Sequence, residues 1–208
     1  MAIIIGDIHG QYNAFRRIVD KIPKGTKIIC LGDLIDRGPE GPEVIQYCMD
    51  NDITCLRGNH EDMMIDYYEG NKKYQRGTWL YNGGNTTLAN YETKPMEYLK
   101  KHLEFIKTWE YSMIIDECFL SHAPMLSSRN IWDSDTNYNL MWNRELPSKW
   151  IKGQKKQLLQ VFGHNSHWGL KWFKSEHVNT YALCIDTTAS KIITVFDTIS
   201  KNITQENY

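Results

Sequence analysis

Side chains that can bind metals, transfer protons or bind anions follow five separate apolar runs of the chain. Each run is short and apolar, as buried strands are. Ligands bind in open α/β sheets outside the carboxyl ends of the strands, so these side chains are expected to meet at one edge. They are Asp7 and His9 after the first run, Asp33, Asp36 and Arg37 after the second, Asn59 and His60 after the third, then His122 and His164.

Each of these residues has an ordinary explanation when it is taken singly. Asp7, Asp33 and Asn59 could be turn or helix-capping residues, and His122 could be a core histidine bonded to backbone. Four of the seven histidines, however, stand at predicted strand ends. This concentration favours one common site over five separate structural roles.

The donor types of this set suit a particular chemistry. Carboxylate and imidazole ligands without thiolates favour Mn, Fe or Zn over calcium or a structural zinc. A carboxylate can bridge two metals, and such a pair activates a shared water for in-line displacement at phosphorus. Arginine adds bidentate recognition of phosphate oxygens. The set is therefore sufficient for metal-dependent hydrolysis of a phosphate ester.

Alternating strand and helix signals would position these residues. Strands are predicted over 3–5, 27–31 and 53–56, with helices over 15–22 and from Pro42 onward between them. This order predicts parallel strands with right-handed crossovers. Further strands are predicted over 113–115, 118–121, 158–162, 181–185 and 192–196, the first two forming a hairpin.

The middle of the chain is expected to form a helical, cap-like region at about 62–110. Helical patterns over 61–68 and 96–109 flank a strong turn signal at 82–85. The polar residues from about 200 onward are expected to be frayed. All 208 residues fit a single domain, 1–208.

Composition excludes several classes of function. A net charge of −1 argues against non-specific nucleic-acid binding. Five scattered cysteines, no secretion signal and no apolar stretch of ~20 residues predict a cytoplasmic protein without a membrane span. This would be the host cytoplasm if a phage encodes the chain, and the oligomeric state is left open.

Three blocks resemble the signatures of the phosphoprotein phosphatase (PPP) family of metallophosphoesterases, and its small prokaryotic and phage branch in particular. They read GDIHG at 6–10, GDLIDRG at 32–38 and RGNHE at 57–61. Shorter blocks SHA, WNR, FGH and CIDT, at 121–123, 142–144, 162–164 and 184–187, extend the resemblance over about 3–197. The resemblance implies a calcineurin-like fold of class α/β (α+β), a central β-sandwich of mixed sheets flanked by helices.

The resemblance also implies a dinuclear metal centre. Two divalent ions are expected, with Mn preferred and Fe, Zn or Ni compatible with the same ligands. By position, the first ion would be bound by Asp7 and His9, both ions would be bridged by Asp33, and the second would be bound by Asn59, His122 and His164.

The remaining matched positions imply the catalytic groups. Arg37, Asn59 and Arg144 would hold the phosphate of the substrate. His60 would be the general acid for the leaving oxygen, oriented by Asp36, while a metal-bridging hydroxide attacks phosphorus directly.

A few positions depart from the family pattern or fall outside it. Thr188 stands where the family usually has glycine, which concerns a loop near the site rather than a ligand. Arg129 lies in the same long loop as the later phosphate-binding arginine and is interpreted as a surface charge. His167 is expected on the surface or behind the ligands, and His102 and His177 are expected to be solvated.

The substrate remains open between alternatives. A protein serine/threonine phosphatase is expected first, and a dinucleoside polyphosphate (diadenosine tetraphosphate) or RNA-end hydrolase is the alternative. A catalytically inactive adaptor is a third reading, which the intact metal and acid positions disfavour. The partner is thus a phosphoprotein or a phosphorylated small molecule. An aromatic group could stack on bases or pack the cap helices, and it comprises Tyr67, Tyr68, Tyr74, Trp79 and Tyr81.

Overall fold

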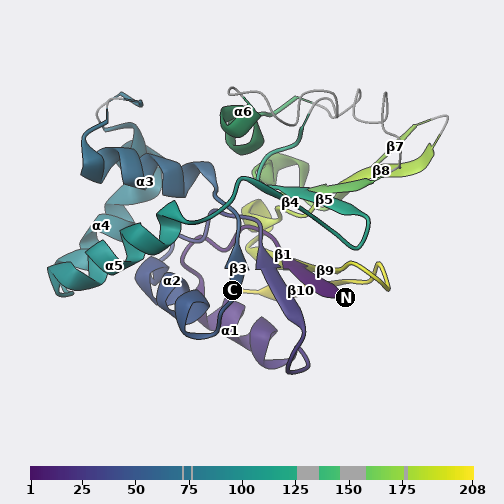
Figure 1. The fold of residues 1–208 in the computed structure, drawn as a ribbon, viewed down its shortest axis with the longest axis horizontal. Coiled ribbons are helices and arrows are strands. Elements are labelled where there is room, and N and C mark those ends of the chain that lie inside the picture. Colours follow the sequence, from purple (N-terminus) through teal and green to yellow (C-terminus); the bar gives the residue numbers. More distant parts are fainter. Residues whose placement is uncertain (72, 76, 126–135, 146–157, 176–177) are drawn as a thin grey trace.

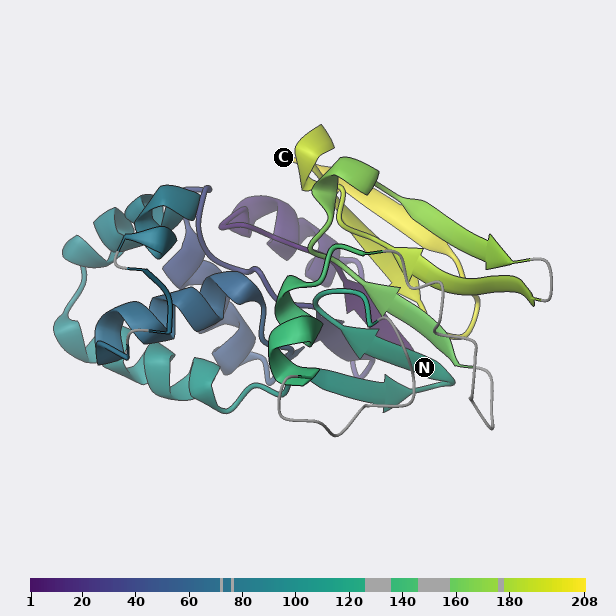
Figure 2. The same ribbon diagram turned by 90° about the horizontal axis from the view of Figure 1, so that it is seen from above.

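A computed structural model describes residues 1–71, 73–75, 77–125, 136–145, 158–175 and 178–208. Two five-stranded mixed sheets pack against each other, and helices lie on their outer faces (Figures 1 and 2). The predicted sandwich of mixed sheets flanked by helices is confirmed.

The first sheet has the strand order β10-β9-β1-β2-β3. Its strands β1, β2 and β3 are parallel and are joined through α1 and α2, as the alternating signals predicted. Strand β9 closes the other side of β1 in antiparallel pairing. The bounds are β1 Ala2–Ile5, α1 Tyr12–Asp20, β2 Lys27–Cys30, α2 Gly41–Asp50, β3 Thr54–Cys55, β9 Ile192–Asp197 and β10 Ile203–Asn207.

Strand β10 overturns the expectation that the last residues are frayed. It pairs with β9, with Ile203 opposite Phe196. The carboxylate of Glu206 also accepts hydrogen bonds from Arg17 of α1 and from Lys21 directly after it, at 2.7 Å each. An edge strand bonds to one neighbour and needs few apolar side chains, so its polar composition concealed it.

The second sheet has the order β4-β5-β6-β8-β7. The predicted hairpin joins β4 to β5, and Asp116 and Glu117 at its turn have φ of 46° and 62°, the left-handed backbone that tight hairpins require. Strand β7 was not among the predicted strands. The bounds are β4 Ser112–Ile115, β5 Cys118–Ser121, β6 Leu159–Phe162, β7 Lys171–Ser175 and β8 Val178–Cys184.

Successive side chains of the central strands point to opposite faces of their sheet, and this divides the core into layers. Ile4 of β1 lies in the cluster between the two sheets, whereas the next residue, Ile5, packs toward the helices of the first sheet. In β5, Leu120 lies between the sheets and Phe119 packs on the opposite face. A strand buried on both faces reads as a continuous apolar run for this reason.

Helices between β3 and β4 gather to one side of the sheets (Figures 1 and 2). Helix α3 begins at Asn59, directly after β3, so Asn59 and His60 lie in its first turn. Within the described residues, no helix is long and apolar enough to cross a bilayer. The bounds are α3 Asn59–Glu69, the short π-helical η1 Leu80–Gly84, α4 Asn85–Glu92, α5 Met96–Lys107 and, later in the chain, α6 Thr136–Trp142, with the 3₁₀ turns η3 Ser166–Trp168 and η4 Thr188–Ser190.

The structure partly contradicts the exposure to solvent expected for the remaining histidines. His102 of α5 is fully buried, not solvated. Its Nδ1 lies 2.7 Å from the Tyr91 hydroxyl and its Nε2 lies 3.0 Å from Oε1 of Gln46, so two polar partners made its burial feasible. His167 is exposed. His177 and Arg129 lie outside the described residues.

Candidate metal centre

The structure brings the six predicted metal-binding residues together. They follow β1, β2, β3, β5 and β6, whose carboxyl ends meet across the two sheets. Each side chain is almost completely withdrawn from solvent. The exposed fractions are 2% for Asp7, 3% for His9, 2% for Asp33, 3% for Asn59, 0% for His122 and 5% for His164.

Several loops of the centre have an unusual backbone. Five of the predicted site residues have positive φ: His9 at 46°, Asp33 at 53°, Asp36 at 69°, Arg37 at 67° and His164 at 64°. Such conformations cost free energy in residues with side chains and cluster at functional sites. The surrounding packing therefore holds these side chains in directions that a relaxed turn would not give.

Two glycines allow the backbone to approach the carboxylates closely. A Cβ atom at Gly58 would lie 2.2 Å from Oδ1 of Asp33, and one at Gly163 would lie 2.1 Å from Oδ1 of Asp7. Any side chain at either position would displace a carboxylate. This steric requirement explains why glycine stands directly before Asn59 and His164.

Asp33 lies between two groups of histidines. Its Oδ2 is 3.7 Å from Nε2 of His9, whereas its Oδ1 is 3.3 Å from Nε2 of His122. Two groups of buried donor atoms, each within a span of 4.8 Å, share this carboxylate: His9, Asp33 and His60, and Asp33, His122 and His164. One carboxylate oxygen for each group is the arrangement that a bridging ligand needs.

Lone pairs converge around His122. Its Nδ1 lies 3.1 Å from the Leu31 carbonyl and must donate to it, which leaves Nε2 as an acceptor. That Nε2 lies 2.9 Å from Oδ1 of Asn59 and 3.1 Å from Nδ1 of His164. His164 Nε2 is buried without a partner among the described residues. The contact with Asn59 joins acceptor to acceptor, and the residues present therefore fit a bound cation.

The first group is also complementary to positive charge. Nδ1 of His9 lies 2.9 Å from the Ile35 carbonyl, so its Nε2 presents a lone pair to the site. The guanidinium of Arg37 stands there, with Nη1 2.6 Å from that Nε2. A cationic side chain thus shows that this position accepts positive charge.

Burial sets the protonation states of the ligands. It lowers the pKa of His9 to about 3 and that of His164 to about 2, and it also lowers the pKa of His122. All three imidazoles are therefore neutral at pH 7, which is the form that binds metals. Burial raises the pKa of Asp7 well above its usual range, and repulsion by Asp186 and Asp33 adds to this. Cations would relieve this repulsion.

His60 and Asp36 form a buried pair beside Asp33. Nδ1 of His60 donates to Oδ2 of Asp36 at 2.6 Å. Asp36 also accepts from the indole Nε1 of Trp79 at 2.8 Å and from the hydroxyl of Thr87 at 2.6 Å. Burial lowers the pKa of His60, but Asp33 and the hydrogen bond to Asp36 outweigh it and raise the pKa overall. The pair can therefore carry a proton.

Two exposed arginines reach back to the buried histidines. Arg37 also places Nη2 3.0 Å from Nε2 of His60. Arg144 donates from Nη1 to the carbonyl of His164 at 3.1 Å and to Oδ1 of Asn165 at 3.2 Å. Both predicted phosphate-binding arginines therefore lie at the solvent side of the centre, one beside each group of histidines.

Sequence reasoning assigned no role to two acidic residues of the matched blocks. Glu61 accepts hydrogen bonds from the backbone N–H groups of Asp33 at 2.9 Å, Leu34 at 2.8 Å and Gly58 at 3.0 Å. Asp186 accepts from the backbone N–H of Thr188 at 3.1 Å and from its hydroxyl at 2.7 Å. The block patterns singled these residues out, but only the fold shows what they hold.

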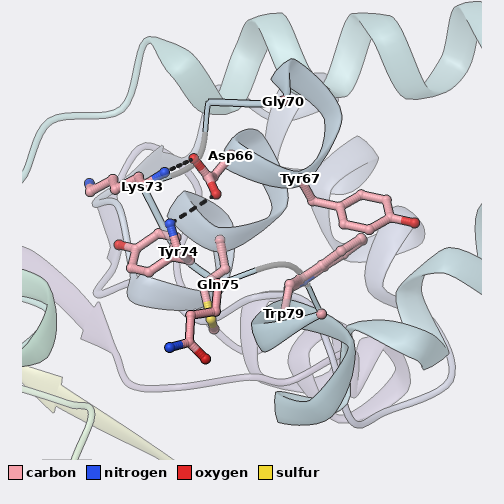
Figure 3. A pocket seen from close by; sticks show the side chains of 9 residues that line it. Asp66, Tyr67, Gly70, Lys73, Tyr74, Gln75 and Trp79 are labelled. Carbon is pink, nitrogen blue, oxygen red and sulfur yellow. Dashed lines mark hydrogen bonds between the residues drawn. The ribbon is translucent and has the colours of Figure 1, made fainter.

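The aromatic group after the third block lies along α3. Three of its members, Tyr67, Tyr74 and Trp79, line part of a pocket of about 840 Å³, with Tyr67 and Trp79 packed against each other at one end (Figure 3). Their ring centroids are 5.0 Å apart, and Trp79 is only 2% exposed. Tyr74 hydrogen-bonds to Asp62, while Tyr81 is 93% exposed. Most of the aromatic rings thus pack against the protein itself.

Comparisons with known proteins agree with this geometry. The model of the calcineurin-like phosphoesterase family matches residues 2–192, and the chain belongs to that family. It is 26% identical to serine/threonine-protein phosphatase 2 of Escherichia coli (strain K12) over 172 residues, 77% of this chain and 78% of that protein. It is 30% identical to the asymmetrical bis(5'-nucleosyl)-tetraphosphatase PrpE of Anoxybacillus flavithermus (strain DSM 21510 / WK1) over 142 residues, 58% of this chain and 56% of that protein.

The fold is shared with a crystal structure of a protein proposed to be a diadenosine tetraphosphatase. The TM-score is 0.72 at 14% identity, covering 100% of this chain and 93% of that one. This likeness concerns the fold alone. Family membership and the buried His and Asp groups together make the protein a metal-binding phosphoesterase, as the sequence predicted.

Proposed function

We propose that the protein hydrolyses phosphomonoesters of serine and threonine in proteins. Two divalent metal ions, Mn by preference, would be held by the predicted ligand set, with Asp33 shared between them. The ions would supply an activated water and neutralise the phosphate oxygens. Protonation of the leaving group and binding of the phosphate would be carried out by the protein's own side chains.

His60 serves as the general acid. Because Nδ1 donates to Asp36, the proton that the imidazolium can transfer is on Nε2, which lies 3.7 Å from Oδ2 of Asp33. A serine or threonine alkoxide is a strongly basic leaving group and depends on this proton. Arg37 and Arg144 at the solvent side hold the phosphate oxygens, which fixes the leaving oxygen toward His60.

The His60–Asp36 pair is the observation that carries the choice of substrate. A nucleotide leaving from a polyphosphate is a weak base and gains little from an acid. Here the acid is buried and its carboxylate is held by Trp79 and Thr87 as well, an arrangement that suits an alkyl ester.

The region along α3 supports the same choice. The ring of Trp79 packs on that of Tyr67, and the ring of Tyr74 packs on that of Trp142, instead of standing free for base stacking. Met63, one helical turn after His60, lines the pocket. The pocket offers room for residues that flank a phosphorylated side chain.

The second candidate is a dinucleoside polyphosphate hydrolase, favoured by the similarity to the Anoxybacillus tetraphosphatase. The manganese-loaded protein should be assayed for kcat/KM on a phosphoserine peptide and on diadenosine tetraphosphate side by side. We expect the peptide to be the better substrate. A clear preference for the dinucleotide would reject the proposal and would make the exposed Tyr81 a candidate for base contact.

A further inference from the structure

Three cysteines converge in the core between the first sheet and its helices. Cys30 ends β2 and Cys55 ends β3, opposite each other in parallel register, while Cys48 projects from α2. Their sulfur atoms all lie within 4.8 Å of one another, and the three residues are 0%, 5% and 0% exposed in that order. The other cysteines, Cys118 and Cys184, are buried in different clusters.

The three thiols lie beside one another, and the Cys55 thiol also donates to the Ile53 carbonyl at 3.6 Å. Hydrogen bonds from Cys48, first, and from Cys55 lower the pKa of the Cys30 thiol to about 5. Burial raises the pKa of Cys48 and of Cys55 well above the usual range. Cys30 is therefore the most readily ionised of the three, and its neighbours retain protons that can be given to a leaving group.

The surroundings restrict what these sulfurs can bind. Thiolates select soft ions, but three of them around a monovalent or divalent cation leave excess negative charge in an apolar core. The buried carboxylate of Glu61 also lies close enough to raise the pKa of Cys48, and so disfavours further negative charge. A trivalent thiophilic centre leaves no net charge.

We propose that Cys30, Cys48 and Cys55 form a three-thiolate binding site for trivalent arsenic, taken up as arsenite. At each cysteine an S–H bond and an As–OH bond break, an As–S bond forms, and the proton leaves with the hydroxide as water. As(OH)₃ and three thiols thus give As(S-Cys)₃ and three waters, with no change of oxidation state. The existence of this site does not depend on whether the proposed phosphatase function is correct.

Occupation of this site would affect the metal centre through shared strands. Asp33 follows Cys30 by three residues, and Asn59 follows Cys55 by four. The N–H of Leu56 also donates to the Cys30 carbonyl at 2.9 Å, which couples the two strand ends. Strand β3 is two residues long and lies at the sheet edge, so its local opening admits arsenite at low cost.

The test is to add sodium arsenite to the folded, manganese-loaded protein in a thiol-free phosphine reductant. Native mass spectrometry should show one added arsenic with loss of three hydrogens, and near-ultraviolet absorption should report As–S bonds. The Tm should rise, because the ligand binds the folded state. Cadmium, added in parallel, should give no thiolate absorption band. A cadmium band without arsenite uptake would overturn the charge argument and the proposal.

Matched variants distinguish this cluster from other buried thiols. Cys30→Ala and Cys55→Ala should abolish arsenic uptake, whereas Cys118→Ala and Cys184→Ala should retain it, with folding checked by circular dichroism. Peptide mapping of the arsenic adduct of the native protein identifies the cysteines that bind arsenic, even if a variant fails to fold. Equal uptake by Cys30→Ala and the native protein, or arsenic found on Cys118 or Cys184, would overturn the proposal.

Discussion

The imidazole of His60 donates from Nδ1 to Oδ2 of Asp36 across 2.6 Å, and both side chains are almost fully buried. This bond fixes the tautomer of His60 and directs Nε2 toward Asp33 and the metal groups. Asp36 is held in turn by Trp79 and Thr87, which come from a different part of the chain. The proposed acid is thus positioned by the packing of the helical region on the sheet.

His60→Asn should leave manganese binding nearly intact and lower kcat on an alkyl phosphate by about 10²–10⁴-fold, because the leaving alkoxide loses its proton donor. The loss on p-nitrophenyl phosphate should be much smaller, since that leaving group needs little protonation. Steady-state kinetics on both esters checks this, with the exposed His167→Asn as control. Unchanged turnover of the alkyl ester would refute the acid role.

Trp79→Phe should affect catalysis through Asp36, since it removes the indole donor while the ring remains. The freed carboxylate would stabilise the His60 imidazolium more strongly, so the basic limb of the kcat–pH profile should move to higher pH. We expect kcat to fall up to about tenfold at pH 7, the scale of one hydrogen bond to a charged group. Trp168→Phe, whose ring packs on Phe162 and Phe173, is the control. A uniform fall of kcat at every pH, with no shift of the limb, would argue for a merely structural role.

Much of the centre could be predicted because its residues follow their strands closely. Asp7, Asp33 and His122 stand within three residues of a strand end, so the strand pattern alone places them at one edge. Trp79 and Thr87 carry no such signal. They reach Asp36 only because the segment after α3 folds back over the loop that follows β2.

The mistaken expectations have a common physical cause. Polar residues are expected to be solvated, but at these positions a specific partner allows them to be buried or ordered. His102 is buried between Tyr91 and Gln46, and Glu206 in β10 is paired with two basic side chains in and directly after α1. Such pairings join residues far apart in the chain and leave no local pattern.

His102 should make stability depend on pH. Burial lowers its pKa to about 4, from the 6.5 of an unfolded histidine. Between these values the unfolded chain binds a proton that the folded protein does not, so stability is present above pH 6.5 and is lost as pH falls toward 4. The slope from this residue is at most about 1.4 kcal/mol per pH unit.

Thermal melts of the native protein and of His102→Phe across this range test the effect. The variant should lose part of the decline in Tm toward acid pH, although its Tm at pH 7 falls because Tyr91 and Gln46 lose a partner. His167→Gln should keep the native dependence. Parallel curves for the native protein and His102→Phe would exclude His102 as the titrating group.

The number of manganese ions bound per chain tests the central claim most directly. Equilibrium dialysis of the native protein should give two, and Asp33→Asn should lose at least one, because one oxygen serves each group of histidines. The exposed Asp20→Asn should still bind two. Fewer than two ions in the native protein, or two ions bound with unchanged affinity in Asp33→Asn, would contradict the account.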